Sequence, residues 1–488
     1  MILLPPSSGG PCAPRPRAPR SPRTGLGLLA AGLALVAAPA LAGGQRVPPD
    51  SARRPSVDSL RADSLSPDSL AARLARAEAA IALLRRQLAE QSESAVQAST
   101  RLHVVLSARV LTNAFLTDGR VNLVDVPQVV LAPPAGGAPP GSGGAAGLTL
   151  RQTRLGAGLL VDDVLGAAFA ADVDVDFSGG GASAPGERRL FPEPRLRTAR
   201  ARLAWARTEL LIGSETPLVS DLDPISLASV GTPNFSGAGN LWNWLPQLRF
   251  TRELGATTIG RARLRWAVQG AVLEPYAGLQ APGEPDAVDA GERSRRPFLE
   301  GRVRARWGEA SEERELPATD DLLLRGGEVG VGGHRGWVSA GGARHASRAL
   351  TADVRLGLGG RAELRGEGYV GGQLLRGLGG GAIAQAYAPA AGGGATGDVA
   401  APLRDAAGWA QLNVQPHPVL VGGVGCGVDV VDDDDGPLRE RNAVCAAHVL
   451  WRPVEPLLAG LEFRRLRTRY ANGTFGAHHL NLAFGVEF

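Results

Sequence analysis

The C-terminal four-fifths of the chain alternates between apolar residues and polar or small ones, with a period of two, from about residue 102 onward. Residues 479–488 show the pattern most clearly, because Leu, Phe or Val stands at every even position and His, Asn, Ala, Gly or Glu at every odd one. Successive side chains of a β-strand point to opposite faces, so this period predicts strands that each have one apolar face.

The alternation predicts about sixteen strands, with a range of roughly 14–18. They lie near residues 102–116, 147–157, 164–176, 195–205, 206–213, 245–253, 260–274, 297–307, 327–339, 349–356, 361–371, 407–415, 418–431, 440–451, 456–469 and 476–488. Short connections alternate with long ones such as 117–146, 177–194, 214–244, 275–296 and 372–406. Tight turns on one side and long loops on the other are the layout of a transmembrane β-barrel. The stretch 308–326 departs from this layout because it is long but falls on the short side.

Some predicted strands carry a row of arginines on one face. In one of them, Arg263 and Arg265 alternate with Leu264 and Trp266. A row of arginines needs water, whereas an apolar row needs lipid or a dry core. A closed barrel gives each row its own solvent, with the arginines facing an aqueous lumen. We therefore expect an all-β, antiparallel transmembrane barrel; in the alternative, a soluble sandwich, the arginines would lie on the outer face.

The N-terminal part of the chain has a different organisation. Residues 1–42 combine an arginine-bearing start, an apolar stretch and an Ala-Leu-Ala end, which predicts a cleaved signal peptide. Residues 43–66 are polar and contain Pro, which is typical of a linker. Residues 67–92 predict a helix with a heptad seam made of Leu70, Leu74, Ala77, Ile81, Leu84 and Leu88. We expect a short periplasmic coiled coil before a barrel at 101–488; the alternative is a helix that lies on its own chain.

Charge and hydropathy exclude several classes of protein. The chain holds 52 Lys and Arg against 48 Asp and Glu, and the arginines of the predicted signal peptide account for the whole net charge of +4. The basic balance is therefore not a signature of nucleic-acid binding. After residue 42 there is no apolar run of about 18 residues, so we expect no helical membrane span.

Residues 67–488 resemble, in layout, the trimeric outer-membrane porins that carry an N-terminal periplasmic coiled coil, the dicarboxylate/phthalate type. The more specific similarities are residues 361–369, 378–381 and 479–488, the last of which ends on an aromatic residue as the terminal strands of outer-membrane barrels do. The resemblance implies a water-filled diffusion channel, three per assembly, in the bacterial outer membrane, with the helix in the periplasm. It implies no particular substrate, because the loops that would set it are rich in Ala and Gly.

Porins of this architecture fold the loop between the fifth and sixth strands into the lumen, and residues 214–244 hold that position. This predicted constriction loop carries Glu215, Asp221 and Asp223 and no basic residue. The wall arginines expected to face it are Arg200, Arg202, Arg249, Arg263, Arg265, Arg302 and Arg304. Acid on the loop and base on the wall set a transverse field that orients and selects ions, with a weak preference for anions. The alternative is an ordinary solvated loop.

Trp242 and Trp244, in the same loop, either line a path for an organic or sugar solute or anchor the loop against the wall. An interfacial aromatic belt is expected to include Trp205, Trp266, Trp307 and Trp451.

Cys426 and Cys445 lie equidistant from an Asp-Gly turn at 435–436, so a two-residue hairpin would set them opposite each other on the lipid-facing side. Both a disulfide and two small thiols fit this placement. Residues 432–435 form an acidic tip, which we interpret as a solvated external turn rather than a calcium site.

The sequence contains no HExxH, GxSxG or Walker-type motif and no Cys/His cluster, so we expect no catalytic activity, no cofactor and no metal site. The expected function is passive diffusion of small hydrophilic solutes, anions among them. One alternative is a non-conducting barrel that tethers the envelope by binding cell-wall polymer through its coiled coil; an outer-membrane enzyme is less favoured. The expected partners are two further copies of the chain and outer-membrane lipid.

Overall fold

The computed structural model describes residues 95–99, 102–134, 136–137, 143–179, 187–260, 262–279, 288–308, 322, 324–340, 342–380, 387–389, 399–432, 435 and 438–488. All of them belong to the second of two compact units, Leu74–Phe488. The predicted signal peptide, linker and coiled-coil helix, with its seam residues, lie outside the described residues.

Most of the described chain is β-strand. The strands are β1 (Ala95–Ser99), β2 (Leu102–Thr117), β3 (Ala145–Thr149), β4 (Arg154–Val164), β5 (Ala167–Asp176), β6 (Arg195–Trp205), β7 (Thr208–Glu215), β8 (Leu245–Ile259), β9 (Ala262–Leu273), β10 (Phe298–Trp307), β11 (Gly327–Ala340), β12 (Ala343–Leu358), β13 (Ala362–Gln373), β14 (Tyr387–Pro389), β15 (Val399–Pro402), β16 (Arg404–His417), β17 (Leu420–Val431), β18 (Arg439–Trp451), β19 (Leu457–Tyr470) and β20 (Gly473–Glu487). Short helices in the connections are α4 (Glu187–Leu190), η1 (Glu292–Ser294) and η2 (Arg376–Leu378). Of the residues described, none forms a helix with the length and apolar character that crossing a membrane requires.

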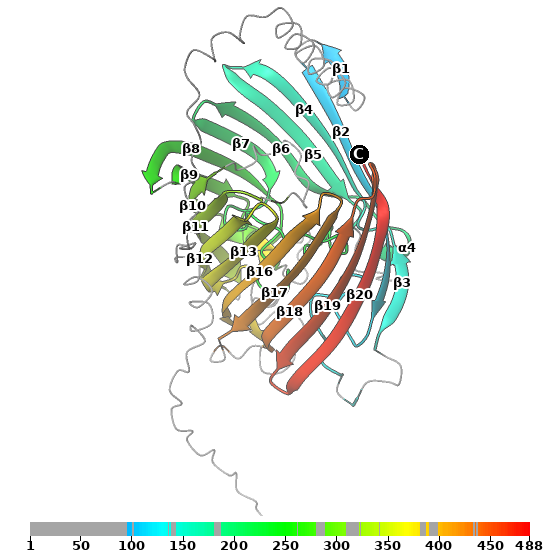
Figure 1. Ribbon diagram of the computed structural model, residues 1–488. Coiled ribbons are helices and arrows are strands. Elements are labelled where there is room, and N and C mark those ends of the chain that lie inside the picture. Colours follow the sequence, from blue (N-terminus) through cyan, green and yellow to red (C-terminus); the bar gives the residue numbers. More distant parts are fainter. Residues whose placement is uncertain are drawn as a thin grey trace, which may run out of the picture. The chain divides into compact units, whose positions relative to one another are not determined.

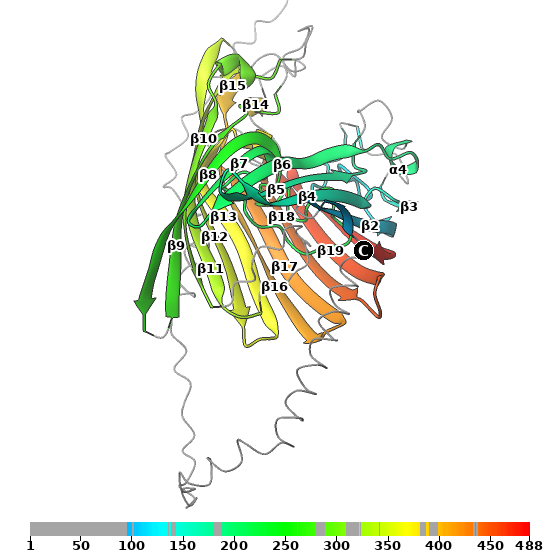
Figure 2. The same ribbon diagram turned by 90° about the horizontal axis from the view of Figure 1, so that it is seen from above.

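The strands form one closed antiparallel sheet (Figures 1 and 2). β3 and β4 share one position in it, because β4 pairs with the first half of β2 and β3 with the second. β20 closes the ring by pairing residues 479–487 with residues 109–117 of β2. Ala108 and Phe488 extend the closure with two mutual backbone hydrogen bonds of 2.8 and 3.0 Å. The barrel has 16 strand positions, which confirms the fold predicted from the alternation; β14 and β15 form a separate two-stranded sheet.

Several strand bounds differ from those expected from the pattern. β12 begins at Ala343 rather than near 349, because its pairing with β11 starts at Ala343, which lies opposite Ala340. β8 continues to Ile259 rather than ending near 253, since a bulge after Glu253 lets the pairing with β9 go on. β1 precedes the expected start of the barrel at 101 and pairs with the first residues of β2.

The two ends of the barrel differ in the length of their connections. At one end, here called the short-turn end, a few residues join β4 to β5, β6 to β7, β8 to β9 and β16 to β17. The other end, the long-loop end, carries the connections 118–144, 177–194, 216–244, 274–297 and 374–403. Two hairpins at the long-loop end are nevertheless tight, because Ala340 of β11 pairs with Ala343 of β12 and Tyr470 of β19 pairs with Gly473 of β20.

The outward face of the sheet is apolar and exposed. Leu350, Val331 and Leu148, which come from different parts of the ring, are 67, 65 and 64% exposed. In β20, exposed Leu482 stands next to Asn481, which is 1% exposed and points inward. An exposed apolar surface that follows the whole ring is stable in lipid and unstable in water.

The tryptophans expected in an aromatic belt gather at one border of this surface. Trp205 and Trp451 are the last residues of β6 and β18, directly before short turns. Trp307 is the last residue of β10 at the same end of the barrel, before the longer connection 308–326. Trp266 pairs with Gly255, in the part of β9 that leads from the β8–β9 turn. Tryptophan at the edge of an apolar band is typical of a membrane–water border, so this belt marks the short-turn end.

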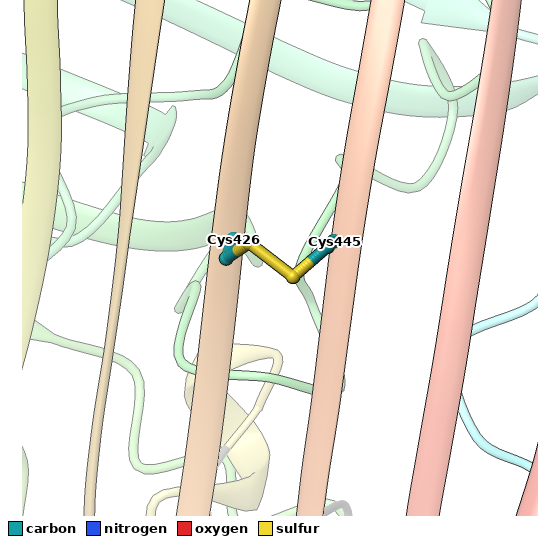
Figure 3. The surroundings of a disulfide bond; sticks show 2 residues. All are labelled: Cys426 and Cys445. Carbon is teal, nitrogen blue, oxygen red and sulfur yellow. A yellow bond between two sulfur atoms is a disulfide. The ribbon is translucent and has the colours of Figure 1, made fainter.

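A disulfide joins two neighbouring strands on the outward face (Figure 3). Cys426 of β17 and Cys445 of β18 are directly opposite in the strand register, with Cα atoms 4.0 Å apart. Both residues are exposed. Of the two arrangements that the sequence allowed, the structure has the bonded one.

We expect this bond to link the strands without being required for the fold, because the full ladder of backbone pairs between β17 and β18 remains without it. In the denatured protein, a maleimide carrying polyethylene glycol should label Cys426 and Cys445 only after reduction. The Cys426→Ser variant should fold and gain one site that is labelled without reduction. Labelling of the wild type at two sites before reduction would mean that the thiols are free.

Candidate pore constriction

The connection from β7 to β8, residues 216–244, folds into the barrel. Its backbone meets inward-facing side chains from strands far apart around the ring. The Leu222 amide donates to Glu367 of β13 at 2.6 Å, and the Ile225 amide donates to Gln411 of β16 at 2.7 Å. Asn113 of β2 donates to the Leu227 carbonyl at 2.9 Å. The segment therefore crosses the lumen, which is the position predicted for the constriction loop.

Glycines let the second half of the loop pack directly on the wall. Gly239 has a φ of +104°, and a Cβ there would lie 2.4 Å from the Gly408 nitrogen of β16. A Cβ on Gly427 of β17 would lie 2.2 Å from the Ala238 carbonyl oxygen. Side chains at these positions would push the loop away from β16 and β17.

Apolar contacts complete the anchoring of the loop. Phe235 and Ala238 pack in one cluster with Trp409, Val444 and Leu466 of the wall. A second cluster contains Ile225, Leu227, Val230, Leu111, Leu450 and Leu458. Burial of this apolar surface holds the loop in one place, so residues 216–244 are a fixed part of the barrel.

The predicted acids of the loop have different surroundings. Glu215, the last residue of β7, is buried and pairs with Arg200. Asp221 has a 23% exposed side chain and pairs with Arg302 at 2.9 Å. Burial raises the pKa of Asp221, but the guanidinium groups of Arg302 and Arg249 outweigh that effect and hold the pKa at about 2. For Asp223, burial raises the pKa above its ordinary value despite the nearby Arg197.

Arg302 of β10 is the centre of the ion-pair network. Its side chain is 1% exposed and contacts Asp221, Glu328 and Asp353 at 2.9, 3.0 and 2.5 Å. It also donates to Gln269 of β9 at 3.0 Å. One guanidinium thus connects the loop to strands on both sides of β10.

The predicted wall arginines do not all lie together. Those with partners near the loop or on the adjoining walls are Arg200, Arg202, Arg249, Arg302 and Arg304. Arg263 and Arg265 are instead exposed, next to the β8–β9 turn at the short-turn end. They share the inward face of β9 but lie beyond the level of the constriction, because the alternation fixes the face of a residue and not its height in the barrel.

Carboxylates of the wall were missed by the sequence analysis. Asp172, Asp174 and Asp176 alternate along β5 and are all buried on its inward face. Asp172 pairs with Arg200 at 2.9 Å, and Asp176 pairs with Arg195 at 2.7 Å. The alternation of Asp with Val in this segment was the signal that could have found them. The wall therefore carries both signs of charge. The sequence analysis compared only the wall arginines with the loop acids and so overstated the basic character of the wall.

Trp242 and Trp244 lie at the end of the loop, against arginines of β6. Their rings are 5.3 Å apart in an edge-on arrangement. The guanidinium carbon of Arg197 lies 4.4 Å from the ring centre of Trp244, and that of Arg195 lies 5.2 Å from the same ring. These cation–π contacts attach the end of the loop to the wall, which is the anchoring role that the sequence left open.

A second buried network fixes the connection that follows β13. His334 of β11 lies between Glu300 of β10, at 3.0 Å, and Ser347 of β12, at 2.9 Å. The Ser347 hydroxyl also lies 3.2 Å from the Leu374 carbonyl, to which it donates. Ser347 has an exposed fraction of 0%, so this arrangement has no opening for a substrate and serves to hold residue 374 in place.

Within the ranges that the structure describes, no group of three or more His, Cys, Asp or Glu side chains is arranged to hold a metal ion. The acidic tip is described only in part: Asp432 and Asp435 pair with Arg404 at 2.9 and 2.8 Å.

No protein-family model matches the chain, and a comparison with curated proteins finds no match. Among solved structures, the outer-membrane channel DcaP of Acinetobacter baumannii is similar with a TM-score of 0.56 and 14% identity, over 81% of this chain and 100% of that one. The anion-selective porin from Comamonas acidovorans has a TM-score of 0.47 and 12% identity, over 79% of this chain and 100% of that one. The second superposition is too loose to support an argument. The likeness to the first shows the fold alone: the chain is a closed 16-strand antiparallel barrel with a porin-like fold.

We expect Arg302→Ala to destabilise the barrel, because it leaves Asp221 of the loop and Glu328 and Asp353 of the wall close together without their shared cation. Removing one partner of a buried ion pair costs roughly 3–5 kcal/mol. The measurement is the temperature at which the folded band converts to the unfolded one in electrophoresis with little detergent.

The matched control is Arg265→Ala, which removes the same charge at an exposed position of the short-turn end. Equal melting temperatures for the two variants would contradict the central role of Arg302.

Proposed function

We propose that this protein is an outer-membrane channel for the passive diffusion of small hydrophilic solutes. The observation that carries the proposal is the loop 216–244, which lies inside a barrel whose outward face is apolar. Along the loop and the adjoining wall, charged side chains remain partly open to water: Asp221 is 23% exposed and Arg195 28%. A polar passage narrowed by a fixed loop selects solutes by size and charge.

The site residues keep the roles expected of them as part of this proposal. Glu215, Asp221 and Asp223 belong to the constriction loop, and Arg200, Arg202, Arg249, Arg302 and Arg304 to the wall that faces it. We assign Arg263 and Arg265 to the entrance at the short-turn end. Asp172 pairs with Arg200 and Arg202, and Glu328 and Asp353 pair with Arg302. Because these carboxylates offset part of the positive charge of the wall, we propose at most a weak preference for anions.

We also propose that three copies assemble in the bacterial outer membrane, with residues 67–92 as a coiled coil in the periplasm. The heptad seam from Leu70 to Leu88 supports this assembly, since an isolated helix would leave its leucines in water. The belt of tryptophans at the short-turn end is consistent with a membrane border on that side.

A second candidate function is a non-conducting barrel that tethers the envelope. It is favoured by the extent of the loop contacts, because residues 216–244 touch β2, β10, β13, β16, β17 and β18 and so meet the wall on several sides. A measurement of conductance distinguishes the two functions, because only the channel conducts ions.

Purified protein in a planar bilayer should give stepwise conductance, in groups of three if the trimer is the working unit. Replacing residues 219–240 with a short Gly-Ser linker removes the segment that crosses the lumen, so the unit conductance should rise roughly twofold or more. Heat-modifiable migration on gels provides the check on folding. Folded wild-type protein that never conducts would favour the tether over the channel.

Ion selectivity tests the assignment of the wall. The pair Arg195→Gln and Arg202→Gln removes two positive charges near the loop and leaves Asp172 and Asp176 less compensated, so permeability should shift toward cations by roughly twofold or more. The reversal potential in a salt gradient measures it.

The control pair, Arg263→Gln and Arg265→Gln, removes the same charge at the short-turn end and should have a smaller effect. A larger shift from the control pair would place the selective region at the entrance instead.

A further inference from the structure

Arginines interrupt the apolar outward face of the barrel on β18 and β19. Arg465, Arg467 and Arg469 follow one another on the outward face of β19, and all three are exposed. Arg441 of β18 is also exposed and lies directly opposite Arg469. We call these four residues the outer arginine patch.

The orientation of the patch follows from the burial of the residues between its members. Leu466 and Thr468 are 1 and 0% exposed and point into the barrel. On the outward face of the same strand, Leu461 and Phe463 are exposed and come before the arginines. β19 therefore passes from apolar to basic on its outward face as it approaches the long-loop end.

The patch contains more positive charge than its surroundings neutralise. Arg441 faces Arg469 across the strands, and Arg465 faces His478 of β20. Glu440 pairs with Arg469 at 2.7 Å, and Asp118 pairs with His478 at 2.9 Å. For the guanidinium groups of Arg441, Arg465 and Arg467, the described part of the chain provides no hydrogen bond or ion pair. Like charges directly opposite each other on adjacent strands repel, so an anion between them would stabilise the sheet.

The position of the patch indicates the kind of anion. The cost of an arginine on the lipid face falls from the centre of the bilayer toward its border, where phosphate-bearing headgroups lie. Ala443 and Gly476 are the cross-strand neighbours of Arg467, so small residues flank the arginine on both sides. The guanidinium group pairs well with phosphate oxygens.

We propose that the outer arginine patch binds the phosphate groups of a lipid headgroup in the outer leaflet. The lipid's acyl chains would lie on the apolar surface formed by residues such as Leu461 and Phe463, and its phosphates would lie between the arginines. The short-turn end has tryptophans at its border instead, so the two borders of the barrel fit different headgroups.

A second copy of the chain is a poorer occupant of the patch. An interface between copies would need an acidic surface to meet the arginines. In the described strands, no outward face presents two carboxylates in succession. The nearest acids, Glu440 and Asp118, are already paired with Arg469 and His478.

The test is native mass spectrometry of the full chain in detergent with added diphosphorylated lipid A, counting the lipids that each chain retains. The variant carries Arg465→Gln, Arg467→Gln and Arg469→Gln. It should retain at least one lipid fewer than the wild type and bind the lipid roughly 100-fold more weakly, since each basic group near a membrane surface contributes about a factor of five. The variant keeps a second outward pair of arginines, Arg335 opposite Arg348. A lipid retained at that pair would hide the loss at the patch in a measurement of bound against unbound protein, so the number of lipids on each chain is counted.

The matched control removes three exposed arginines near the short-turn end: Arg207→Gln, Arg252→Gln and Arg361→Gln. It should retain lipid as the wild type does. Lipid A from which the phosphates have been removed should bind the wild type no better than it binds the patch variant.

Several outcomes would overturn the proposal. These are equal lipid counts for the wild type and the patch variant, equal binding of the phosphate-free lipid, or binding of inorganic phosphate alone with no lipid retained. Loss of the oligomer with unchanged lipid binding would assign the patch to a second copy of the chain. Because the patch lies outside the lumen, the variant should conduct as the wild type does, so the proposed channel function is tested separately.

Discussion

The barrel depends on one constraint: a sheet surrounded by hydrocarbon must pair every backbone amide and carbonyl within itself. The pairing of β2 with β20 meets this constraint, and the mutual hydrogen bonds of Ala108 and Phe488 carry it to the last residue of the chain. An open edge at either strand would leave a row of polar groups in lipid, at a cost of several kcal/mol for each group. The closed ring is therefore the condition under which the apolar outward face can exist.

Closure also places the two faces of each strand in different surroundings: the outward face lies in lipid, and the inward face lies inside the barrel. Inward-facing side chains cannot reach lipid, so they pair with one another or with the loop 216–244. Arg302 shows the consequence, since a 1% exposed guanidinium is stable only because Asp221, Glu328 and Asp353 surround it. The same contacts that compensate this charge hold the loop across the lumen, so folding stability and the size of the passage depend on the same residues.

Much of this could be predicted from the sequence, because a period of two reports directly which face a residue occupies. The number of strand positions and the two kinds of connection follow from it, whereas the loop that enters the lumen was expected from the resemblance to the trimeric porins. The height of a residue in the barrel does not follow from the period, which is why Arg263 and Arg265 were grouped with Arg302 although they lie near the short-turn end. The pairing of Asp172 with Arg200 also depends on strand register, which alternation alone does not fix. The anchoring of Trp244 by Arg197 likewise required the structure, since both roles of that tryptophan fit the sequence.

The central claim is that alternate residues of each strand face lipid and the inside of a closed barrel. Spin labels placed one at a time at residues 479–484 of β20, in a variant without Cys426 and Cys445 and reconstituted in lipid vesicles, test it most directly. Collision of the label with oxygen, which dissolves in lipid, should be frequent at the even positions and rare at the odd ones. Collision with a water-soluble nickel complex should be rare at the even positions. Oxygen collision without a period of two along β20 would contradict the account.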